Sequence, residues 1–96
     1  MERSFKLKKY DVVYTADAIK SIKKIDKIHQ IRIQKWIQTN LEGCSNPYFS
    51  GIPLKGNKKG EWRYRIGNYR IISHIDDTKI TITIINVGHR QSVYKN

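Results

Sequence analysis

The stretch KGNKKGEWRYRIGNYR, residues 55–70, decides how the rest of the chain is organised. In its second half, large apolar residues alternate with arginines from Trp62 to Ile66. Successive side chains of a β-strand point to opposite faces of a sheet. We therefore expect the apolar side chains on one face and those of Arg63 and Arg65 on the other.

A tight turn is predicted at residues 66–69, because Gly67 and Asn68 tolerate the positive φ angles of hairpin turns. Arg70 then lies in the returning strand. A guanidinium binds phosphate through two parallel hydrogen bonds and keeps its charge near neutral pH. The hairpin is thus a candidate phosphate-binding site. The alternative is an edge hairpin with solvated arginines, and Arg70, Arg90 and the net charge favour the phosphate site.

The length of 96 residues indicates a single domain with one core. The chain has 19 lysines and arginines against 8 aspartates and glutamates, for a net charge of +11. Such a charge points to nucleic acid, an acidic protein or an anionic membrane surface as partner. No apolar run approaches the ~18 residues of a membrane span, and no signal peptide is visible. We expect a cytoplasmic protein that does not act on a membrane.

The cysteine and histidine content argues against disulfide and metal chemistry. Cys44 is the one cysteine, so an internal disulfide is excluded and a reducing compartment is favoured. The three histidines and the cysteine have no zinc-site spacing. We expect neither a metal nor another cofactor.

The front of the chain predicts an arm, a strand and a helical hairpin. Residues 1–9 are interpreted as a loosely held arm, and residues 10–96 as one domain. Residues 10–15 are rich in Val and Tyr and predict a strand. Thr15 is placed to cap the following helix, with Asp17 in its first turn.

Apolar residues at helical spacing predict two helices, with a short break near Asp26 and Lys27. Lysines occupy the remaining surface of the first helix, either as a solvated face or as a contact for an acidic partner. The apolar residues that we expect in the core are Ala18, Ile19, Ile22, Ile25, Ile33, Ile37 and Leu41, flanked by Trp36.

The rest of the chain predicts a loop and a sheet. Residues 43–60, rich in Gly and Pro, form a long loop of the kind that often carries function. Strands are predicted at residues 69–75 and 80–87, joined by a turn at 76–79. Because the strand at 80–87 is apolar on both sides near its end, we expect an interior position in the sheet.

These elements predict an α+β fold: an N-terminal strand, a helical hairpin and a three-stranded antiparallel sheet, with the helices packed on one face. The opposite face would carry the basic residues. We expect there Arg63, Arg65, Arg70 and Arg90, with His89 and Tyr94 as further candidates.

The segments LKGNKKGEWRYRIGNYRIISHIDD and VGHRQSVY, together with YDVVYTADAIKSIKKID at the front, resemble the RelE family of type II toxin–antitoxin modules. The resemblance covers roughly residues 10–94. It implies a RelE-like fold and a ribosome-dependent, metal-independent endoribonuclease that cleaves mRNA in the A site and arrests translation. It also implies an acidic, RelB-like antitoxin as partner, beside the ribosome and mRNA, in a hetero-oligomeric complex.

The resemblance implies catalytic positions as well. Arg63 and Arg65 fall where the best-known members have catalytic lysines, and Arg70 matches the arginine of the strand after the hairpin. Arg90 and Tyr94 match an arginine and a tyrosine beyond the last strand. The basic residues that we expect to bind RNA or the ribosome are Lys55, which matches a basic residue at the site in some relatives, and Lys20, Lys23, Lys24, Lys58 and Lys59.

The sequence departs from the family pattern at the proton carrier. Arginine replaces lysine at residues 63 and 65, and Ile52 stands where a related branch has a glutamate. Attack of a 2′-OH requires proton transfer, for which arginine is unsuited because its pKa exceeds ~12. His89 is the predicted imidazole near the arginines, acting in proton transfer or only contacting RNA. His74, in mid-strand, is interpreted as structural.

Two other functions remain open at this point. A ParE-like toxin of the same fold would poison gyrase instead of cleaving RNA, and fold alone does not separate the two. A non-catalytic RNA-binding module would need the charge but not the cluster of arginine, histidine and tyrosine. The chain lacks the paired aromatic residues on one strand that stack bases in common RNA-binding sheets.

Overall fold

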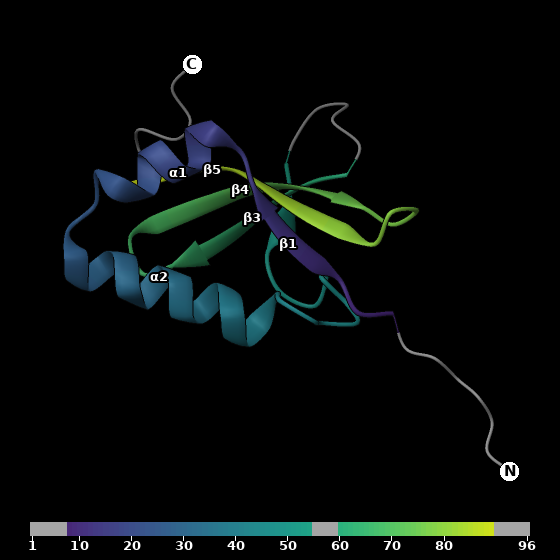
Figure 1. Ribbon diagram of the computed structural model, residues 1–96. Helices are drawn as coiled ribbons and strands as arrows, with labels where there is room; N and C mark the ends of the chain where they lie inside the picture. Colours follow the sequence, from purple (N-terminus) through teal and green to yellow (C-terminus); the bar gives the residue numbers. More distant parts are fainter. Residues whose placement is uncertain (1–7, 55–59, 90–96) are drawn as a thin grey trace, which may run out of the picture.

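The computed structural model of the protein describes residues 8–54 and 60–89. Within them the chain forms two helices and five strands (Figure 1). In chain order these are β1 (Asp11–Tyr14), α1 (Ala16–Lys23), α2 (Lys27–Asn40), β2 (Ile52–Pro53), β3 (Glu61–Ile66), β4 (Tyr69–Asp76) and β5 (Thr81–His89).

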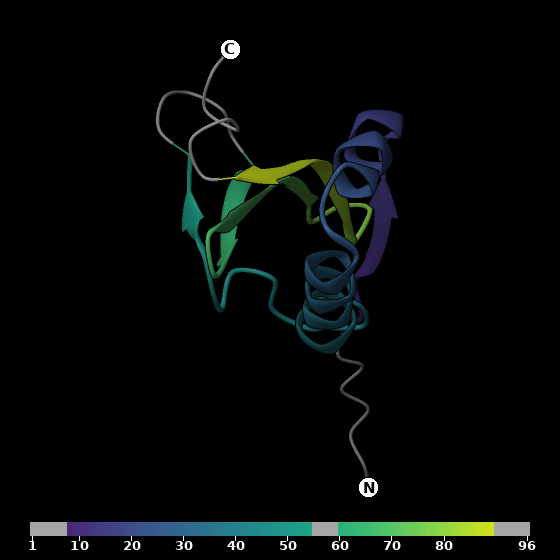
Figure 2. The same cartoon turned by 90° about the vertical axis from the view of Figure 1, so that its left-hand side faces the viewer.

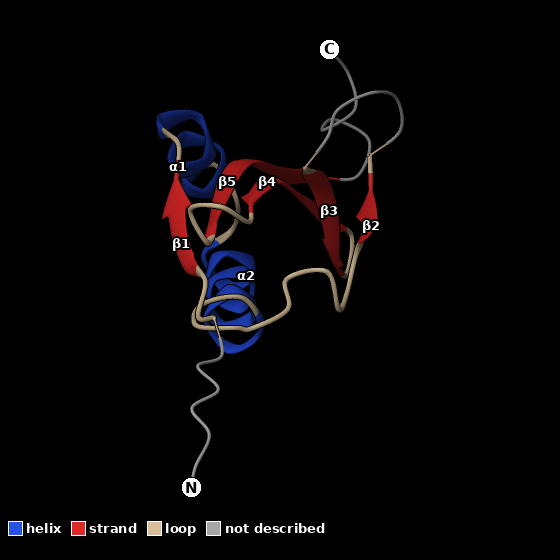
Figure 3. Cartoon of the chain, turned by 90° about the vertical axis from the view of Figure 1, so that its right-hand side faces the viewer, coloured by secondary structure: helices blue, strands red, loops and turns tan. Residues whose placement is uncertain are grey.

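The five strands form one sheet in the order β1-β5-β4-β3-β2. Strand β1 runs parallel to β5, and the other neighbours are antiparallel. Figure 3 shows β1 and β2 at opposite edges of the sheet. The interior position predicted for the strand at residues 80–87 is confirmed, since β5 lies between β1 and β4.

Both helices lie on one side of the sheet, which we call the covered face (Figure 2). Helix α1 begins after Thr15, whose side-chain oxygen accepts a hydrogen bond of 3.0 Å from the backbone N–H of Ala18. Asp17 lies in the first turn, where its negative charge interacts favourably with the helix dipole. The predicted cap is thereby confirmed. The predicted break between the helices is confirmed as well, because α1 ends at Lys23 and α2 begins at Lys27.

The core lies between the helices and the covered face. Tyr64 is fully buried, and its ring contacts that of Trp36 of α2, with 5.5 Å between the ring centroids. Directly opposite Tyr64 in the sheet is Ile71, and opposite Ile71 is Val87, so one cross-strand row supplies three buried side chains. The other buried apolar residues are Tyr10, Ala18, Ile22, Ile33, Ile37, Leu41, Ile66, Ile75, Ile82 and Ile84.

Aromatic side chains hold the loop between α2 and β3 against the sheet. The Tyr64 hydroxyl donates a hydrogen bond to the Pro47 carbonyl, and the Trp62 indole N–H donates to the Ser50 carbonyl at 2.7 Å. The Tyr48 ring meets Trp62 edge-on, with 4.9 Å between centroids. Trp62 and Tyr64 therefore pack on the same face of the sheet, as the alternation in this strand predicted, with Tyr64 in the core and Trp62 against it.

One carboxylate ties this loop to the start of β1. The hydroxyls of Tyr10 and Tyr48 donate hydrogen bonds of 2.8 and 3.0 Å to Asp77, in the turn between β4 and β5. Burial, reinforced by the hydrogen bond to Asp77, raises the pKa of each of these two tyrosines to about 12. Both phenols consequently stay protonated and keep donating at any ordinary pH.

The predicted fold class is confirmed, and the structure adds two features to it. Strand β1 joins the same sheet through β5, and the two-residue strand β2 extends the sheet beyond β3. Strand β2 was not predicted, because two residues cannot display an alternating pattern. Ile19 departs from the predicted core stripe, since 44% of its surface is exposed.

Candidate functional site

The face of the sheet opposite the helices, which we call the open face, carries the arginines of β3 and β4. Arg65 lies directly opposite Arg70, and Arg70 lies opposite Gly88 of β5. Directly opposite residues of paired strands point to the same face. Arg65, Arg70 and Gly88 therefore form one cross-strand row, the arginine row, as the alternation in β3 predicted.

The hairpin turn fixes this pairing. Ile66 pairs with Tyr69, so Gly67 and Asn68 make a two-residue turn. Gly67 has φ of +61°, whereas Asn68 keeps a negative φ. Glycine at the first central position is typical of a type II′ turn, whose twist matches that of the flanking strands. Arg65 and Arg70 are thus held one residue from each side of a rigid turn.

Arg70 is the most unusual residue of the site, because only 6% of its surface is exposed. Its Nε and Nη1 atoms are buried and have no hydrogen-bond partner among the described residues. A guanidinium in this state has lost water without gaining compensating bonds, which costs free energy. The alternating pattern indicates the face that Arg70 occupies, but it does not indicate this burial.

The arginine row is also unfavourable electrostatically when empty. Like charges directly opposite each other in a sheet destabilise it, and Arg65 and Arg70 stand in that relation. Gly88, the third member, contributes no side chain that could satisfy the guanidinium. A bound anion would relieve both the charge repulsion and the missing hydrogen bonds of Arg70.

Arg63 lies one step further along the same ladder. It is half-buried, and it pairs with Ile72 of β4 on one side and with Ile52 of β2 on the other. Arg63 and Arg65 are two residues apart, so their Cα atoms are about 6.6–6.8 Å apart along the strand. The open face therefore presents three guanidinium groups from two neighbouring strands.

His89 does not share this face, contrary to our expectation. It pairs with Tyr69, and the two rings meet edge-on with 5.4 Å between centroids. Tyr69 in turn contacts His29 of α2, at 5.3 Å between centroids, which places this group on the covered face. His89 is exposed, but its ring belongs to a cluster beside α2 and not to the arginine row.

A β-bulge explains the position of His89. Ile72 pairs with Asn86 whereas Ser73 pairs with Ile84, so Ile85 is an extra residue in β5. One extra residue moves every later side chain to the other face. The consecutive isoleucines at 84 and 85 were interpreted as burial on both sides, although they mark the bulge.

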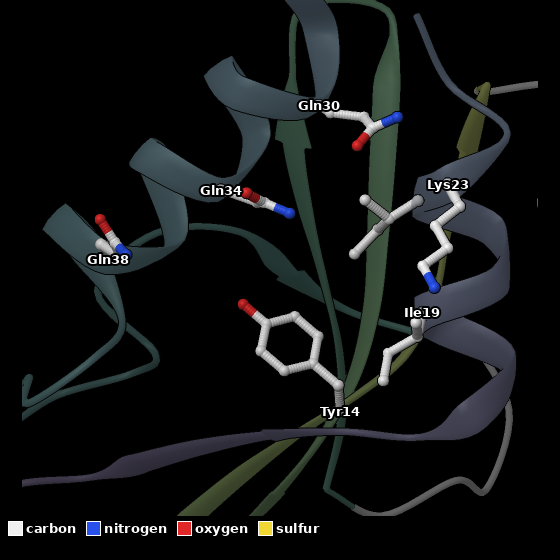
Figure 4. A pocket seen from close by; sticks show the side chains of 7 residues that line it. Tyr14, Ile19, Lys23, Gln30, Gln34 and Gln38 are labelled. Carbon is white, nitrogen blue, oxygen red and sulfur yellow. The ribbon is translucent and has the colours of Figure 1, made fainter. Parts of the chain in front are cut away.

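The predicted RNA-binding lysines at α1 are all exposed. Lys20 and Lys23 lie on the helix, and Lys24 caps its C-terminal end. Lys24 lines a pocket of about 460 Å³ together with Gly88 and His89 at the end of β5. Lys23 borders a groove of about 340 Å³ between α1 and α2, the helix groove. Figure 4 shows Tyr14 and Ile19 on one side of this groove and a row of three glutamines of α2 on the other. Those glutamines are Gln30, Gln34 and Gln38.

Sequence reasoning missed two polar residues of the open face. Glu61 pairs with His74, and both lie on the same side as the arginines, since residues 61, 63 and 65 alternate in phase with 74, 72 and 70. The period-two pattern itself could have placed His74 there. We interpreted it as structural because it lies in mid-strand.

Five predicted site residues lie outside the described residues. They are Lys55, Lys58, Lys59, Arg90 and Tyr94. Residues 8–54 and 60–89 contain no group of three or more His, Cys, Asp or Glu that could hold a metal ion. Neither helix in these ranges is long and apolar enough to cross a membrane.

The chain is similar to toxins of bacterial toxin–antitoxin systems. A family model described as ParE toxin of type II toxin-antitoxin system, parDE, matches residues 12–94. A RelE-like toxin protein of Escherichia coli is 27% identical over 84 residues, which cover 86% of this chain and 85% of that protein. Toxin RelE of Mycobacterium tuberculosis is 27% identical over 86 residues, covering 90% of this chain and 87% of that protein.

Solved structures of such toxins share the fold. The toxin–antitoxin complex RelBE2 of Mycobacterium tuberculosis contains a chain that matches with a TM-score of 0.77 and 28% identity, covering 88% of this chain and 95% of that one. The isolated RelE toxin of Escherichia coli matches with a TM-score of 0.69 and 20% identity, covering 83% of each chain.

Proposed function

The chain belongs to the ParE toxin family and is the toxin of a type II toxin–antitoxin module of RelE/ParE type. We propose that this toxin is an endoribonuclease that cleaves mRNA in the ribosomal A site. The arginine row carries the proposal. The Arg70 guanidinium is nearly buried, two of its nitrogens have no hydrogen-bond partner among the described residues, and it lies opposite a second arginine. Such a group suits a phosphodiester better than it suits a role in folding.

In the proposed reaction, the 2′-oxygen of a nucleotide attacks the adjacent phosphorus. The new bond joins the 2′-oxygen to phosphorus, and the bond from phosphorus to the 5′-oxygen of the next nucleotide breaks. The 2′-OH loses a proton and the leaving 5′-oxygen gains one. The products are a 2′,3′-cyclic phosphate and a 5′-hydroxyl, so the step needs neither metal nor oxidant.

Arg70 and Arg65 would act on the charge of the pentacoordinate phosphorus. The negative charge on its oxygens grows in the transition state, and donors fixed in a site of low polarity stabilise that charge most. Arg70 is held by its position in a central strand, while Arg65 is exposed and adjusts to the substrate. Arg63 then contacts the neighbouring phosphate and keeps the strand aligned.

Proton transfer is assigned to water or to ribosomal groups and not to an arginine. Both guanidiniums remain charged throughout the neutral range, and His89 lies on the covered face. Positioning of the 2′-OH in line with the leaving oxygen supplies much of the acceleration in such a scheme. Dependence on the ribosome follows, because an RNA free in solution is not held in that geometry.

A gyrase poison is the second candidate, because the matching family model is described as a ParE toxin. The experiment that separates the two uses the purified toxin in three parallel assays: ribosomes programmed with a defined A-site codon, the same mRNA without ribosomes, and gyrase supercoiling. We expect mRNA cleavage only on ribosomes. Inhibited supercoiling with intact mRNA would favour gyrase, and neither activity would leave an RNA-binding module.

We further propose an acidic antitoxin segment as the silencing partner. The net charge of +11 attracts an acidic chain, and the helix groove offers Tyr14 and Ile19 as exposed apolar contacts beside Lys23. The structure neighbours include toxin–antitoxin complexes, among them RelBE2 of Mycobacterium tuberculosis, which supports an antitoxin as partner.

The antitoxin proposal makes a prediction about salt and about Ile19. Because apolar contacts share the binding energy with charges, affinity for the product of the neighbouring gene should survive moderate salt. Ile19→Glu should weaken it by roughly 10-fold or more, since burying a carboxylate against apolar side chains is costly. Isothermal titration at two salt concentrations measures this, with the exposed Ile28→Glu as the control on the opposite side of the helical hairpin. Equal losses in the two variants would place the interface elsewhere.

The role of His89 is tested by pH. Without an imidazole in the reaction, the single-turnover cleavage rate on ribosomes should show no step between about pH 5.5 and 7.5, where histidine titrates. His89→Gln should leave that rate within a few-fold of wild type. A step that disappears in His89→Gln, with a loss of roughly 10²-fold, would return His89 to the mechanism.

A further inference from the structure

The open face repeats in steps along the β3–β4 ladder. The arginine row is the first step, Arg63 and Ile72 form the second, and Glu61 and His74 form the third. Each step covers two residues, so neighbouring rows are about 6.6–6.8 Å apart and the third row lies about 13 Å from the first. Successive phosphates of an extended single strand of RNA are separated by a comparable distance. An RNA strand held at the arginine row and running along the ladder reaches the third row two nucleotides later.

The third row differs in chemistry from the first two. Thr83 of β5 pairs with His74 and completes the row. All three residues are half-buried, so they are partly shielded from water but remain accessible to a ligand. The row contains no arginine or lysine, whereas it offers a carboxylate, an imidazole and a hydroxyl. These groups suit the edges of bases better than phosphates.

Glu61 and His74 are not paired with each other. They are directly opposite in the sheet, yet the described residues show no ion pair between them within 4.0 Å and no hydrogen bond of either side chain. The other open-face acid, Asp76, accepts hydrogen bonds from the backbone N–H groups of Thr78 and Lys79 and thereby serves a turn. Within the described part of the chain, the Glu61 side chain accepts no such hydrogen bond.

The surroundings of His74 hold its ring in place. Gly60 has φ of +82°, and a Cβ at this position would lie 3.0 Å from His74 Cε1 and 3.0 Å from the Ile75 carbonyl oxygen. The imidazole therefore packs closely against the backbone that leads into Glu61.

We propose that Glu61, His74 and Thr83 read a guanine base of the bound RNA and so set the sequence preference of cleavage. A carboxylate on a face that binds phosphates repels the RNA unless hydrogen-bond donors of the RNA bind to its oxygens. Guanine presents two adjacent N–H donors, at N1 and N2, that match the two carboxylate oxygens. His74 or Thr83 then donates to guanine O6 or N7.

This assignment rests on the proposed function, since it uses the same open face. It is tested by single-turnover cleavage on ribosomes of mRNAs in which each nucleotide near the cut is guanine or inosine in turn. Inosine lacks the N2 amino group and keeps the rest of the base edge. The same RNAs are assayed for binding to the toxin without ribosomes. The variants are Glu61→Gln and His74→Gln, and Glu42→Gln is the control, because it removes a charge from an exposed site off the open face.

For wild type and Glu42→Gln we expect one position, displaced from the cut, at which inosine lowers cleavage roughly 5-fold or more. Glu61→Gln should lose this discrimination while binding guanine-free RNA at least as well as wild type. If Glu61→Gln still cleaves and still distinguishes guanine from inosine, the assignment of the third row is wrong, and the proposed nuclease activity is unaffected. If no RNA is cleaved but binding still shows the Glu61-dependent preference for guanine, the proposed nuclease activity is wrong and the assignment of the third row as a guanine site is supported. No preference in either assay overturns the row.

Discussion

Arg70→Met is expected to abolish cleavage and, at the same time, to make the folded toxin more stable. Loss of one donor to a developing oxyanion typically lowers kcat by roughly 10²–10³-fold, and methionine removes every donor of Arg70. Single-turnover cleavage on ribosomes measures this part of the prediction. Growth arrest on expression should disappear with it.

The gain in stability follows from the buried guanidinium. Its Nε and Nη1 atoms are buried, with no hydrogen-bond partner in residues 8–54 and 60–89, and its charge faces that of Arg65. Methionine fills much of the same space and needs no hydrogen bonds. Replacing a buried, poorly compensated charge by an apolar residue of similar size stabilises by about 1–3 kcal/mol. Urea unfolding of the two proteins should therefore show a higher midpoint for Arg70→Met at an unchanged slope.

Arg65→Met is the matched control, because Arg65 is exposed and lies directly opposite. It should also lose cleavage, but its stability should change by less than about 0.5 kcal/mol beyond the relief of repulsion. A destabilised Arg70→Met protein would mean that the guanidinium supports the fold. Full cleavage by either variant would remove the arginine row from the mechanism.

The alternation of residues 62–66 was sufficient to predict the faces of β3, because the side-chain period of a strand is fixed by its geometry. The burial of Arg70 could not be predicted in this way. A period-two pattern states which face a residue occupies, whereas its exposure depends on the neighbouring strand and on the glycine at residue 88. The unfavourable burial of the Arg70 guanidinium therefore follows from the tertiary structure and not from the local sequence pattern.

The wrong face for His89 has a different cause. A bulge at Ile85 shifts the pairing of β5 by one residue, and no local rule distinguishes such an insertion from a strand that is apolar on both sides. The omission of His74 has another cause, since the alternation of β4 places it on the open face and only its mid-strand position led to a structural interpretation. With the bulge taken into account, the open face contains one imidazole among the described residues, and it is that of His74.

Gly51→Ala is expected to destabilise the protein by more than about 3 kcal/mol, the largest effect on stability that we predict. Gly51 has φ of +84°, and a Cβ there would lie 2.4 Å from the carbonyl oxygen of Arg63 and 2.7 Å from Trp62 Nε1. The nearest atom belongs to the backbone of β3, so it cannot move aside without breaking the pairing of β2 with β3. Both the loop and the position of Arg63 depend on this contact.

Gly43→Ala is the matched control, because Gly43 has φ of +77° but nothing lies within 4 Å of a Cβ placed there. It bears only the cost of a left-handed backbone, about 1 kcal/mol. Both substitutions are best made in Arg70→Met, which should be non-toxic and stable enough for the full range to be measured by urea unfolding. Similar losses in the two variants would show that the loop can move away from β3. The loop then could not be what fixes Arg63 on the open face.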